Sequence, residues 1–318
     1  MSTVNAWVHT LKYEAQDIIS VELRPMPGEN LPTFQAGAHI DLHLPSGLVR
    51  SYSLANDSGE RHRYLLGILK DKASRGGSRA VHEQLRVGMC LTIGTPRNNF
   101  PLHEDADHSV LIAGGIGITP ILSMAQRLQA LGRSFEVVYL ARSRAAAAFS
   151  ETLHALACPV HWHFDNEAGG PPNLKVLLAQ RRPKGNSHYY ACGPAVMLDA
   201  FESACTELAY ANAHIERFAA VEVKAAEDAL QKFSVELRKS QKTFEVNADM
   251  SLHKQLLALK VNVPFSCEEG ICGSCETRVL EGTPDHRDMV LSASEQASNQ
   301  VMMVCVSGCK TERLVLDL

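Results

Sequence analysis

The sequence predicts three successive domains: a small antiparallel β-barrel, an α/β domain built on a parallel sheet, and a small β-rich domain around a cysteine loop. Short alternating apolar runs separated by turn residues fill the first third of the chain. Apolar strands then alternate with longer helical segments, and short strands return near the end. A length of 318 residues exceeds what one core usually supports, so a chain of several domains is expected.

The first domain is predicted over residues 1–103. Its alternating runs are HIDLHL, VRSYSL, RYLLGIL and CLTIG. Turn segments such as LPSG, ANDSGE and RVGM separate them at the spacing of a small antiparallel barrel. One helix is expected near SRAVHEQL. The polar segment HEDADHS, residues 103–109, marks the predicted end of this domain.

The second domain is predicted over residues 104–224. The expected strands are VLIAG, EVVYLA, VHWHF and HYYACG, and the expected helices are ILSMAQRLQAL and AVMLDAFESACTEL. This alternation is typical of a doubly wound parallel sheet. Residues 219–232 are interpreted as a linker.

The third domain is predicted over residues 232–318. It opens with a β-hairpin, FSVELRKSQKTFEV, followed by a short helix that Ser251 caps. The strands ETRVLEG, QVMMVCV and RLVLDL follow the cysteine loop.

Composition excludes several classes of protein. A formal charge of −4 gives no basic footprint for nucleic acid. The longest uncharged stretch, residues 109–125, contains Gly and Pro and is shorter than the roughly 20 apolar residues of a membrane span, so no membrane partner is expected. The first residues lack a signal pattern, and the 9 cysteines are an odd number, so we expect a reducing, cytoplasmic location.

Three cysteines share one loop and a fourth lies on a later strand: Cys267, Cys272, Cys275 and Cys305. The spacing C-x4-C-x2-C…C is that of plant-type [2Fe–2S] ligands. Each of two irons needs two thiolates, which a loop and a later strand can supply together. Gly270 and Gly273 allow positive φ, so that backbone amides can turn towards the sulfurs.

Zinc binding and disulfide formation are the alternative uses of these thiols. Zinc is more often held by two separated C-x2-C pairs, and the sequence has one such pair. The expected compartment disfavours disulfides. Cys309 is a possible fourth ligand in place of Cys305, although the spacing favours Cys305.

The segment GGIGITP, residues 114–120, links a predicted strand to a predicted helix. It departs from the dinucleotide fingerprint because Pro120 occupies the place of the third glycine. We expect Thr119 to be the N-cap, Pro120 to be the first helical residue and Gly132 to end the helix. The loop glycines would let amides approach a pyrophosphate at the helix start: Gly114, Gly115 and Gly117. The alternative is a tight turn with no ligand.

A second turn of this kind ends the strand HYYACGP, with Cys192, Gly193 and Pro194. In open α/β sheets ligands collect at the carboxyl edge of the strands. Cys192 alone would most often be a small buried hydrophobe. Together with GGIGITP, it is predicted to lie beside a nicotinamide.

A nicotinamide delivers two electrons at once and an iron–sulfur cluster accepts one, so a flavin is expected between them. The barrel segment RSYS offers a cation, an aromatic ring and hydroxyls: Arg50, Ser51, Tyr52 and Ser53. An exposed strand of mixed residues is the alternative. Downstream, SRGGS (74–78) leads into a helix with Ser78 as the expected N-cap, and Arg75 and Arg79 add positive charge for a phosphate.

These motifs, in this order, resemble the phthalate dioxygenase reductase family, which includes the vanillate O-demethylase reductases. The resemblance covers the whole chain. It implies an FMN-binding antiparallel β-barrel, a ferredoxin-reductase-like α/β parallel-sheet domain that binds NAD, and a β-grasp plant-type ferredoxin domain.

The resemblance also implies roles for residues. RSYS would contact the flavin and Gly76, Gly77 and Ser78 its phosphate. GGIGITP and CGP would bind the nucleotide. Ser53, Thr119 and Cys192 would line the site of hydride transfer. Phe218 would cover the flavin.

The resemblance further implies that electrons pass from NADH through FMN and the [2Fe–2S] cluster to a separate Rieske-type oxygenase. The chain itself has no paired C-x-H…C-x2-H motif for a Rieske centre. Arg142 and Arg144 could meet the 2′-phosphate of NADPH, but NADH is preferred on resemblance. A reductase for a non-Rieske monooxygenase and an iron–sulfur redox sensor are the alternative functions.

Overall fold

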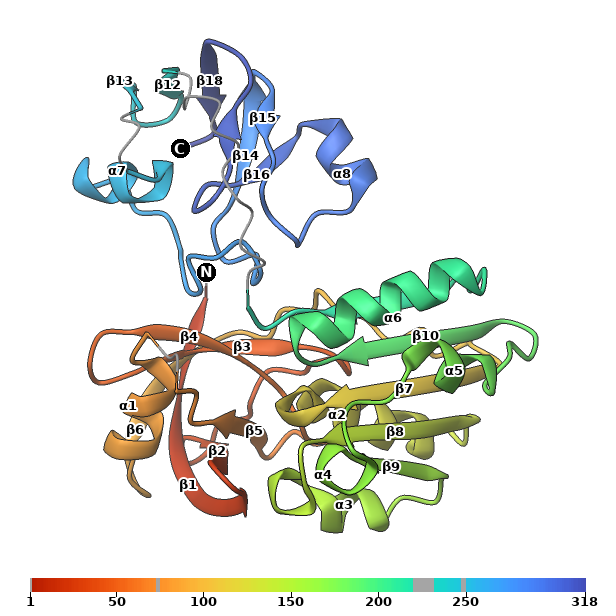
Figure 1. Cartoon of the computed structure of the whole chain (residues 1–318). Helices are drawn as coiled ribbons and strands as arrows, with labels where there is room; N and C mark the ends of the chain where they lie inside the picture. The colour runs from red at the N-terminus through yellow and green to blue at the C-terminus, as the bar shows by residue number, and fades with distance from the viewer. Residues whose placement is uncertain (1, 73–74, 220–231, 247–249) are drawn as a thin grey trace. The chain divides into compact units, whose positions relative to one another are not determined.

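The computed structural model describes residues 2–72, 75–219, 232–246 and 250–318 (Figure 1). The chain divides into two compact units, Met1–Phe218 and Ala219–Leu318, and each is described by itself. Nearly all of the predicted linker, residues 219–232, lies outside the described residues.

The first unit begins with a six-stranded antiparallel sheet in the order β4-β3-β6-β1-β2-β5. A bridge between Leu54 and Leu66 joins the two ends of this order and closes the barrel. Alternate residues point inward and fill the barrel with apolar side chains. The four predicted strands are present, and two longer ones precede them. The elements are β1 (Thr3–Ala15), β2 (Ile18–Pro25), β3 (His39–His43), β4 (Val49–Ser53), β5 (Tyr64–Leu69), α1 (Gly77–Gln84) and β6 (Cys90–Gly94).

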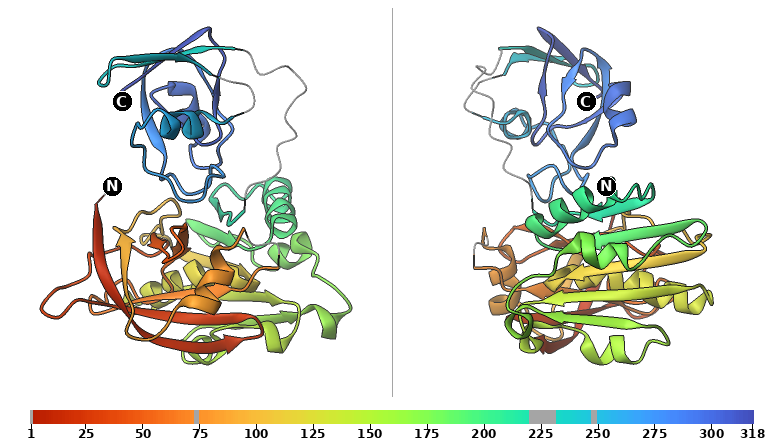
Figure 2. Two further views of the ribbon diagram at one scale, coloured as in Figure 1. Left: turned by 90° about the vertical axis from the view of Figure 1, so that its left-hand side faces the viewer. Right: turned by 45° about the vertical axis from the view of Figure 1, so that its right-hand side comes forward.

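A five-stranded, fully parallel sheet follows in the order β11-β10-β7-β8-β9. Helix α2 packs on one face, and α5 and α6 pack on the other (Figure 2). The strands are β7 (His108–Gly114), β8 (Phe135–Ala141), β9 (Val160–Phe164), β10 (Ser187–Cys192) and β11 (Ala213–Glu216). The helices are η1 (Gly115–Gly117), α2 (Ile118–Ala130), η2 (Arg144–Ala146), α3 (Ser150–His154), α4 (Asp165–Ala168), α5 (Leu174–Ala179) and α6 (Ala195–Glu207). The predicted doubly wound sheet is confirmed.

The start of α2 differs from the prediction. The helix begins at Ile118 with Gly117 as N-cap, so Thr119 is not the capping residue. The hydroxyl of Thr119 instead donates to the carbonyl oxygen of Ile116, at 3.1 Å. Pro120 is the third helical residue, where its missing N–H still costs no helical hydrogen bond. The predicted end is correct, because Gly132 adopts φ 64° directly after the C-cap.

The start of α1 also differs. Gly76, with φ 93°, is the N-cap, and Ser78 lies within the first turn. Its hydroxyl accepts a hydrogen bond from the backbone N–H of Asp71, at 3.2 Å. A left-handed glycine therefore starts this helix earlier than side-chain capping would have done.

The second unit is a small mixed sheet in the order β13-β12-β18-β14-β16, in which β12 and β18 run parallel. Ser251 caps α7 as predicted and accepts from the N–H of Lys254. The unit has its own core, drawn wholly from its own residues. The elements are β12 (Ser234–Leu237), β13 (Lys242–Glu245), α7 (Leu252–Ala258), β14 (Glu276–Glu281), β15 (Pro284–Asp285), α8 (Ala293–Ser298), β16 (Val301–Met303), β17 (Gly308–Cys309) and β18 (Arg313–Leu316). Within the described residues of both units, we find no helix with the length and apolar character needed to cross a membrane.

Candidate functional site

The four predicted ligand cysteines of the second unit are buried and come together in two pairs. The Sγ atoms of Cys275 and Cys305 lie 3.1 Å apart. The thiols of Cys267 and Cys272 form the other pair and share a hydrogen bond. Each of the four side chains is at most 7% exposed. Two pairs of shielded thiols are the donor set that two irons need, at two thiolates each.

The loop around the thiols has the conformation that its glycines predict. Gly270 and Gly273 adopt φ 69° and 73°. A Cβ on Gly270 would lie 2.6 Å from Cγ2 of Val306, so glycine allows the loop to lie close to the turn that follows β16. The amide of Glu269 donates to the sulfur of Cys267, at 3.3 Å. Such amides stabilise negative charge on a sulfur cluster.

Within each pair the two thiols have pKa values shifted in opposite directions, because they share a hydrogen bond. Hydrogen bonds that Cys272 shares with Cys267 and Ser274 hold its pKa below the ordinary value. The hydrogen bond that Cys275 shares with Cys305 lowers the pKa of Cys275 in the same way. The same two contacts raise the pKa of the partner thiols, Cys267 and Cys305, so each pair shares a proton when no iron is bound.

Cys309, the alternative fourth ligand, lies in β17. Its sulfur contacts the hydroxyl of Thr311 at 3.2 Å and the carbonyl oxygen of Thr283 at 3.5 Å. Cys305, and not Cys309, pairs with Cys275.

In the first unit, the two predicted nucleotide turns pack directly on each other at the carboxyl edge of the parallel sheet. A Cβ on Gly117 would lie 2.1 Å from the carbonyl oxygen of Cys192. A Cβ on Gly114 would lie 2.9 Å from Cδ of Pro194, and one on Gly193 would lie 3.0 Å from Cα of Gly114. These glycines are required for the close approach of the two turns. Gly115 has φ 55° and open space around it.

The barrel meets the parallel sheet beside these turns. A Cβ on Gly67 of β5 would lie 2.6 Å from Cγ2 of Thr119. The hydroxyl of Ser53 at the end of β4 donates to Oε2 of Glu216, at 3.3 Å. Glu216 ends β11 and is the register partner of Cys192. The structure thus brings Ser53, Thr119 and Cys192 to one interface and adds Glu216, which no motif had indicated.

Two of these groups keep their protons near neutral pH. Burial raises the pKa of Glu216 to about 8, and the hydrogen bond from Ser53 only partly opposes this effect. Burial, and then the charge of Glu216, raises the pKa of the fully buried Cys192 thiol. Cys192 is therefore a neutral thiol at this edge, not a thiolate nucleophile.

The predicted phosphate site lies where β4 faces the start of α1. The side chain of Arg50 passes so close to Gly77 that a Cβ there would lie 2.5 Å from Cγ of Arg50. The guanidinium donates to the carbonyl oxygens of Val49 and Arg75, at 2.8 and 3.3 Å. A fixed cation beside a helix start with a left-handed Gly76 fits a terminal phosphate group.

The other residues of RSYS divide between the two faces of β4. Burial raises the pKa of Tyr52 to about 12, and the nearby Arg50 acts in the opposite direction. The hydroxyl of Ser51 donates to Oδ1 of Asp41, at 2.7 Å, so this side chain is engaged within the barrel. Ser74 lies outside the described residues. Phe218 is 39% exposed at the end of the first unit.

Two family models match the chain. Residues 111–203 match the oxidoreductase NAD-binding domain, and residues 235–310 match the 2Fe-2S iron-sulfur cluster binding domain. Together with the barrel and the paired thiols, these matches define an NAD-linked iron–sulfur oxidoreductase.

Individual relatives match along the whole chain. The phenoxybenzoate dioxygenase subunit beta of Ectopseudomonas oleovorans is 46% identical over 318 residues, which cover 100% of this chain and 98% of that protein. The vanillate O-demethylase oxidoreductase of Pseudomonas sp. strain HR199 is 46% identical over 319 residues, with 98% of each chain covered. The solved structure of phthalate dioxygenase reductase is 37% identical with a TM-score of 0.74, and the match covers 100% of this chain and 98% of that one.

The chain belongs to the family of phthalate dioxygenase reductase and the vanillate O-demethylase oxidoreductases. Its activity is NADH-dependent electron transfer to a [2Fe–2S] cluster. The predicted fold class is confirmed, and the two family matches show the predicted NAD-binding and [2Fe–2S] domains.

Proposed function

We propose that this chain is the reductase component of a two-component Rieske-type oxygenase and supplies it with electrons from NADH. The relatives named above carry the names of a dioxygenase subunit and an O-demethylase oxidoreductase, which supports a separate oxygenase as the acceptor. The observation that carries the proposal is the set of four buried thiols in two pairs, which fits a one-electron outlet. We also propose a cytoplasmic location, because thiolate ligands and NADH are both kept in a reducing compartment.

The residues of the first unit have proposed roles in binding and orientation. Arg50, Gly76, Gly77 and Ser78 hold the phosphate of FMN, and Ser51, Tyr52, Ser53 and Phe218 hold its ring system. The GGIGITP and CGP turns bind the nucleotide, and Thr119 and Cys192 orient the nicotinamide. The chemistry that bound FMN supplies there is acceptance of a hydride and release of its two electrons one at a time. We place the domains at residues 1–103, 104–224 and 232–318.

The preference for NADH has a structural argument. The segment after β8 would meet the adenosine ribose. Nε and Nη2 of Arg144 donate to the two carboxylate oxygens of Glu167, at 2.7 and 3.0 Å. This ion pair offsets the positive charge of Arg144, which favours NADH over a nucleotide with a 2′-phosphate.

A pair of cysteine variants tests the electron path. Replacing Cys272 with serine removes one ligand, so NADH should still reduce the flavin, while reduction of cytochrome c should fall at least about tenfold. Cys309→Ser is the matched control, because Cys309 is buried in the same unit but is not one of the four paired thiols. Cytochrome c reduction that persists in Cys272→Ser, with the cluster absent, would contradict the proposed path.

The Rieske assignment needs a separate test. The reduced protein should reduce a purified Rieske oxygenase, and bleaching of the Rieske absorbance measures this directly. Electron transfer to a non-Rieske monooxygenase but not to Rieske oxygenases would contradict this part of the proposal.

A further inference from the structure

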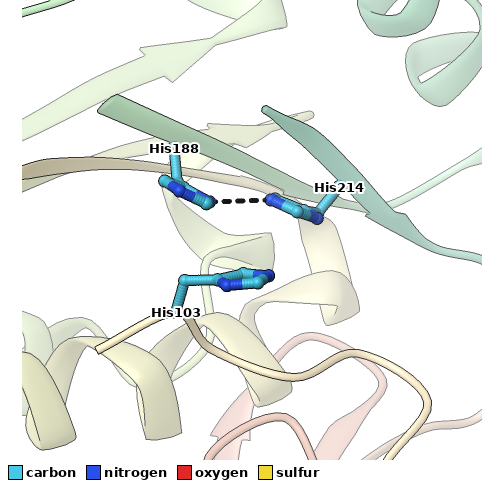
Figure 3. Close-up of side chains that lie close together, drawn as sticks. All are labelled: His103, His188 and His214. Carbon is cyan, nitrogen blue, oxygen red and sulfur yellow. Dashed lines mark hydrogen bonds between the residues drawn. The ribbon is translucent and has the colours of Figure 1, made fainter. Parts of the chain in front are cut away.

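Three histidines from distant parts of the chain meet in the first unit, away from the nucleotide turns. His103 lies in the segment before β7, His188 is the second residue of β10, and His214 is the second residue of β11 (Figure 3). One ring nitrogen from each lies within 4.8 Å of the others. His188 precedes Cys192 by four residues on the same strand, which is about 13 Å of extended chain.

The rings of His188 and His214 face each other through their nitrogens. Nδ1 of His188 and Nε2 of His214 are 2.9 Å apart, and the ring planes differ by 4° (Figure 3). Burial lowers the pKa of both, and the neighbouring His103 lowers them further. A hydrogen bond of 2.9 Å between two ring nitrogens requires that one of them accepts, so at least one ring is neutral, which is the form of imidazole that binds metal ions.

The side chain of Tyr190 contacts two of the three histidines and holds them in place. Its ring stacks on His214 with centroids 4.7 Å apart, and its hydroxyl accepts from the backbone N–H of His103 at 2.8 Å. Tyr190 is fully buried. The backbone of His103 is therefore held next to the other two histidines by a rigid part of the sheet.

We propose that His103, His188 and His214 form a binding site for a divalent transition-metal ion of the zinc class. Imidazole nitrogens suit Zn²⁺, Ni²⁺ and Cu²⁺, whereas Ca²⁺ and Mg²⁺ require oxygen ligands. Three protein ligands leave a fourth position of the tetrahedron for water. Asp105 is exposed nearby, and its charge acts on His188 in the direction that favours a cation.

Small movements complete the site. Two nitrogens bound to one tetrahedral zinc at about 2.0–2.1 Å lie about 3.3 Å apart, so the pair of His188 and His214 must open by roughly 0.4 Å. The ring of His103 is within 32° of parallel to both others, so it must turn to aim a nitrogen at the ion. Its side chain is exposed, so χ1 and χ2 can change without displacing the buried core.

A bound ion would join three segments. It would tie the chain that leaves the barrel to β10 and β11, the strands that end in Cys192 and Glu216. The expected consequence is a higher unfolding temperature of the first unit in the presence of Zn²⁺, because the ion binds the folded state.

Competition with a chromogenic chelator tests the site in the full-length protein with its flavin and cluster. The wild type should take up one Zn²⁺ per chain, and His103→Ala should bind it at least about tenfold more weakly. His62→Ala, which removes an exposed histidine of the barrel, should bind as the wild type does. Equal affinity in His103→Ala and the wild type overturns the proposal.

A second variant and a spectrum complete the test. His214→Asn should lose Zn²⁺ binding to a similar extent, and the visible spectrum of flavin and cluster reports that each variant is folded. X-ray absorption at the zinc edge should find nitrogen ligands at about 2.0–2.1 Å. Sulfur ligands at about 2.3 Å, or loss of iron and sulfide during the titration, would place the zinc at the cysteines and overturn the proposal.

Discussion

Glu216 is a carboxyl group held mostly protonated beside the predicted flavin and nicotinamide sites. Its ordinary pKa is 4.5 and burial raises it to about 8 in the folded protein. Between these values the folded chain holds a proton that the unfolded chain lacks. Stability from this group is therefore complete below about pH 4.5 and is lost as the pH rises through 8.

Replacing Glu216 with glutamine removes this dependence. From pH 5 to pH 8.5 the wild type should lose about 1–2 kcal/mol of unfolding free energy relative to Glu216→Gln, less than the full linkage value because the residue is partly exposed. Urea unfolding followed by the fluorescence of Trp7 and Trp162, both in the first unit, measures it. If the free energies of unfolding of the two proteins change with pH in the same way, Glu216 has its ordinary pKa and the prediction is wrong.

Gly117 permits the contact between the two nucleotide turns. Gly117→Ala places a methyl group 2.1 Å from the carbonyl oxygen of Cys192 in the present geometry, so the turns must separate. We expect kcat/KM for NADH to fall at least about tenfold, with FMN and iron content unchanged. Gly132→Ala is the control, because Gly132 lies at the other end of α2, its Cβ meets open space and the change adds only about 1–2 kcal/mol of backbone strain. A larger fall in kcat/KM in the control variant would show that backbone strain, and not the contact with Cys192, causes the effect.

These residues show what a sequence can predict at this scale. Gly117 and Cys192 were predicted because each belongs to a local motif. Glu216 was missed because only the parallel pairing of β10 with β11 brings it to Cys192. Thr119 and Ser78 were predicted as N-caps from side-chain preference, but Gly117 and Gly76 start the helices earlier through backbone conformation alone.

Among the elements, the segment from β8 to α4 offers the clearest test of nucleotide preference. Arg144 pairs with Glu167 of α4 and lies over the ring of Phe164, with 4.6 Å from the guanidinium carbon to the ring centroid. Glu167→Gln should free the guanidinium for a 2′-phosphate. The ratio of kcat/KM for NADPH over NADH should then rise about threefold to tenfold. An unchanged ratio would mean that Arg144 does not face the ribose.

The elements themselves were predicted unevenly. Strands with a clear alternation or a flanking motif, such as β4, β7 and β10, were found within a few residues. Strand β11 has four residues and no turn signal, so it was missed. The histidine cluster could not be predicted from the sequence either, because it depends on the strand order that places β11 beside β10.

At the scale of the molecule, the chain consists of two units with separate cores. The buried clusters of the first unit draw on no residue beyond 215, and that of the second begins at Phe233. Each unit thus buries its apolar side chains among its own residues. Such units are expected to fold independently.

A fragment of residues 1–218 should therefore fold, bind FMN and reduce ferricyanide with NADH at close to the full-length rate. The same fragment lacks all four ligand cysteines, so its reduction of cytochrome c should fall at least about tenfold. A fragment of residues 232–318 should accept a cluster on reconstitution and show its absorbance. Because ferricyanide takes electrons from flavin directly, the two assays separate the units. A soluble fragment 1–218 that retains full cytochrome c activity would remove the cluster from the path, and an insoluble fragment would show that the units fold only together.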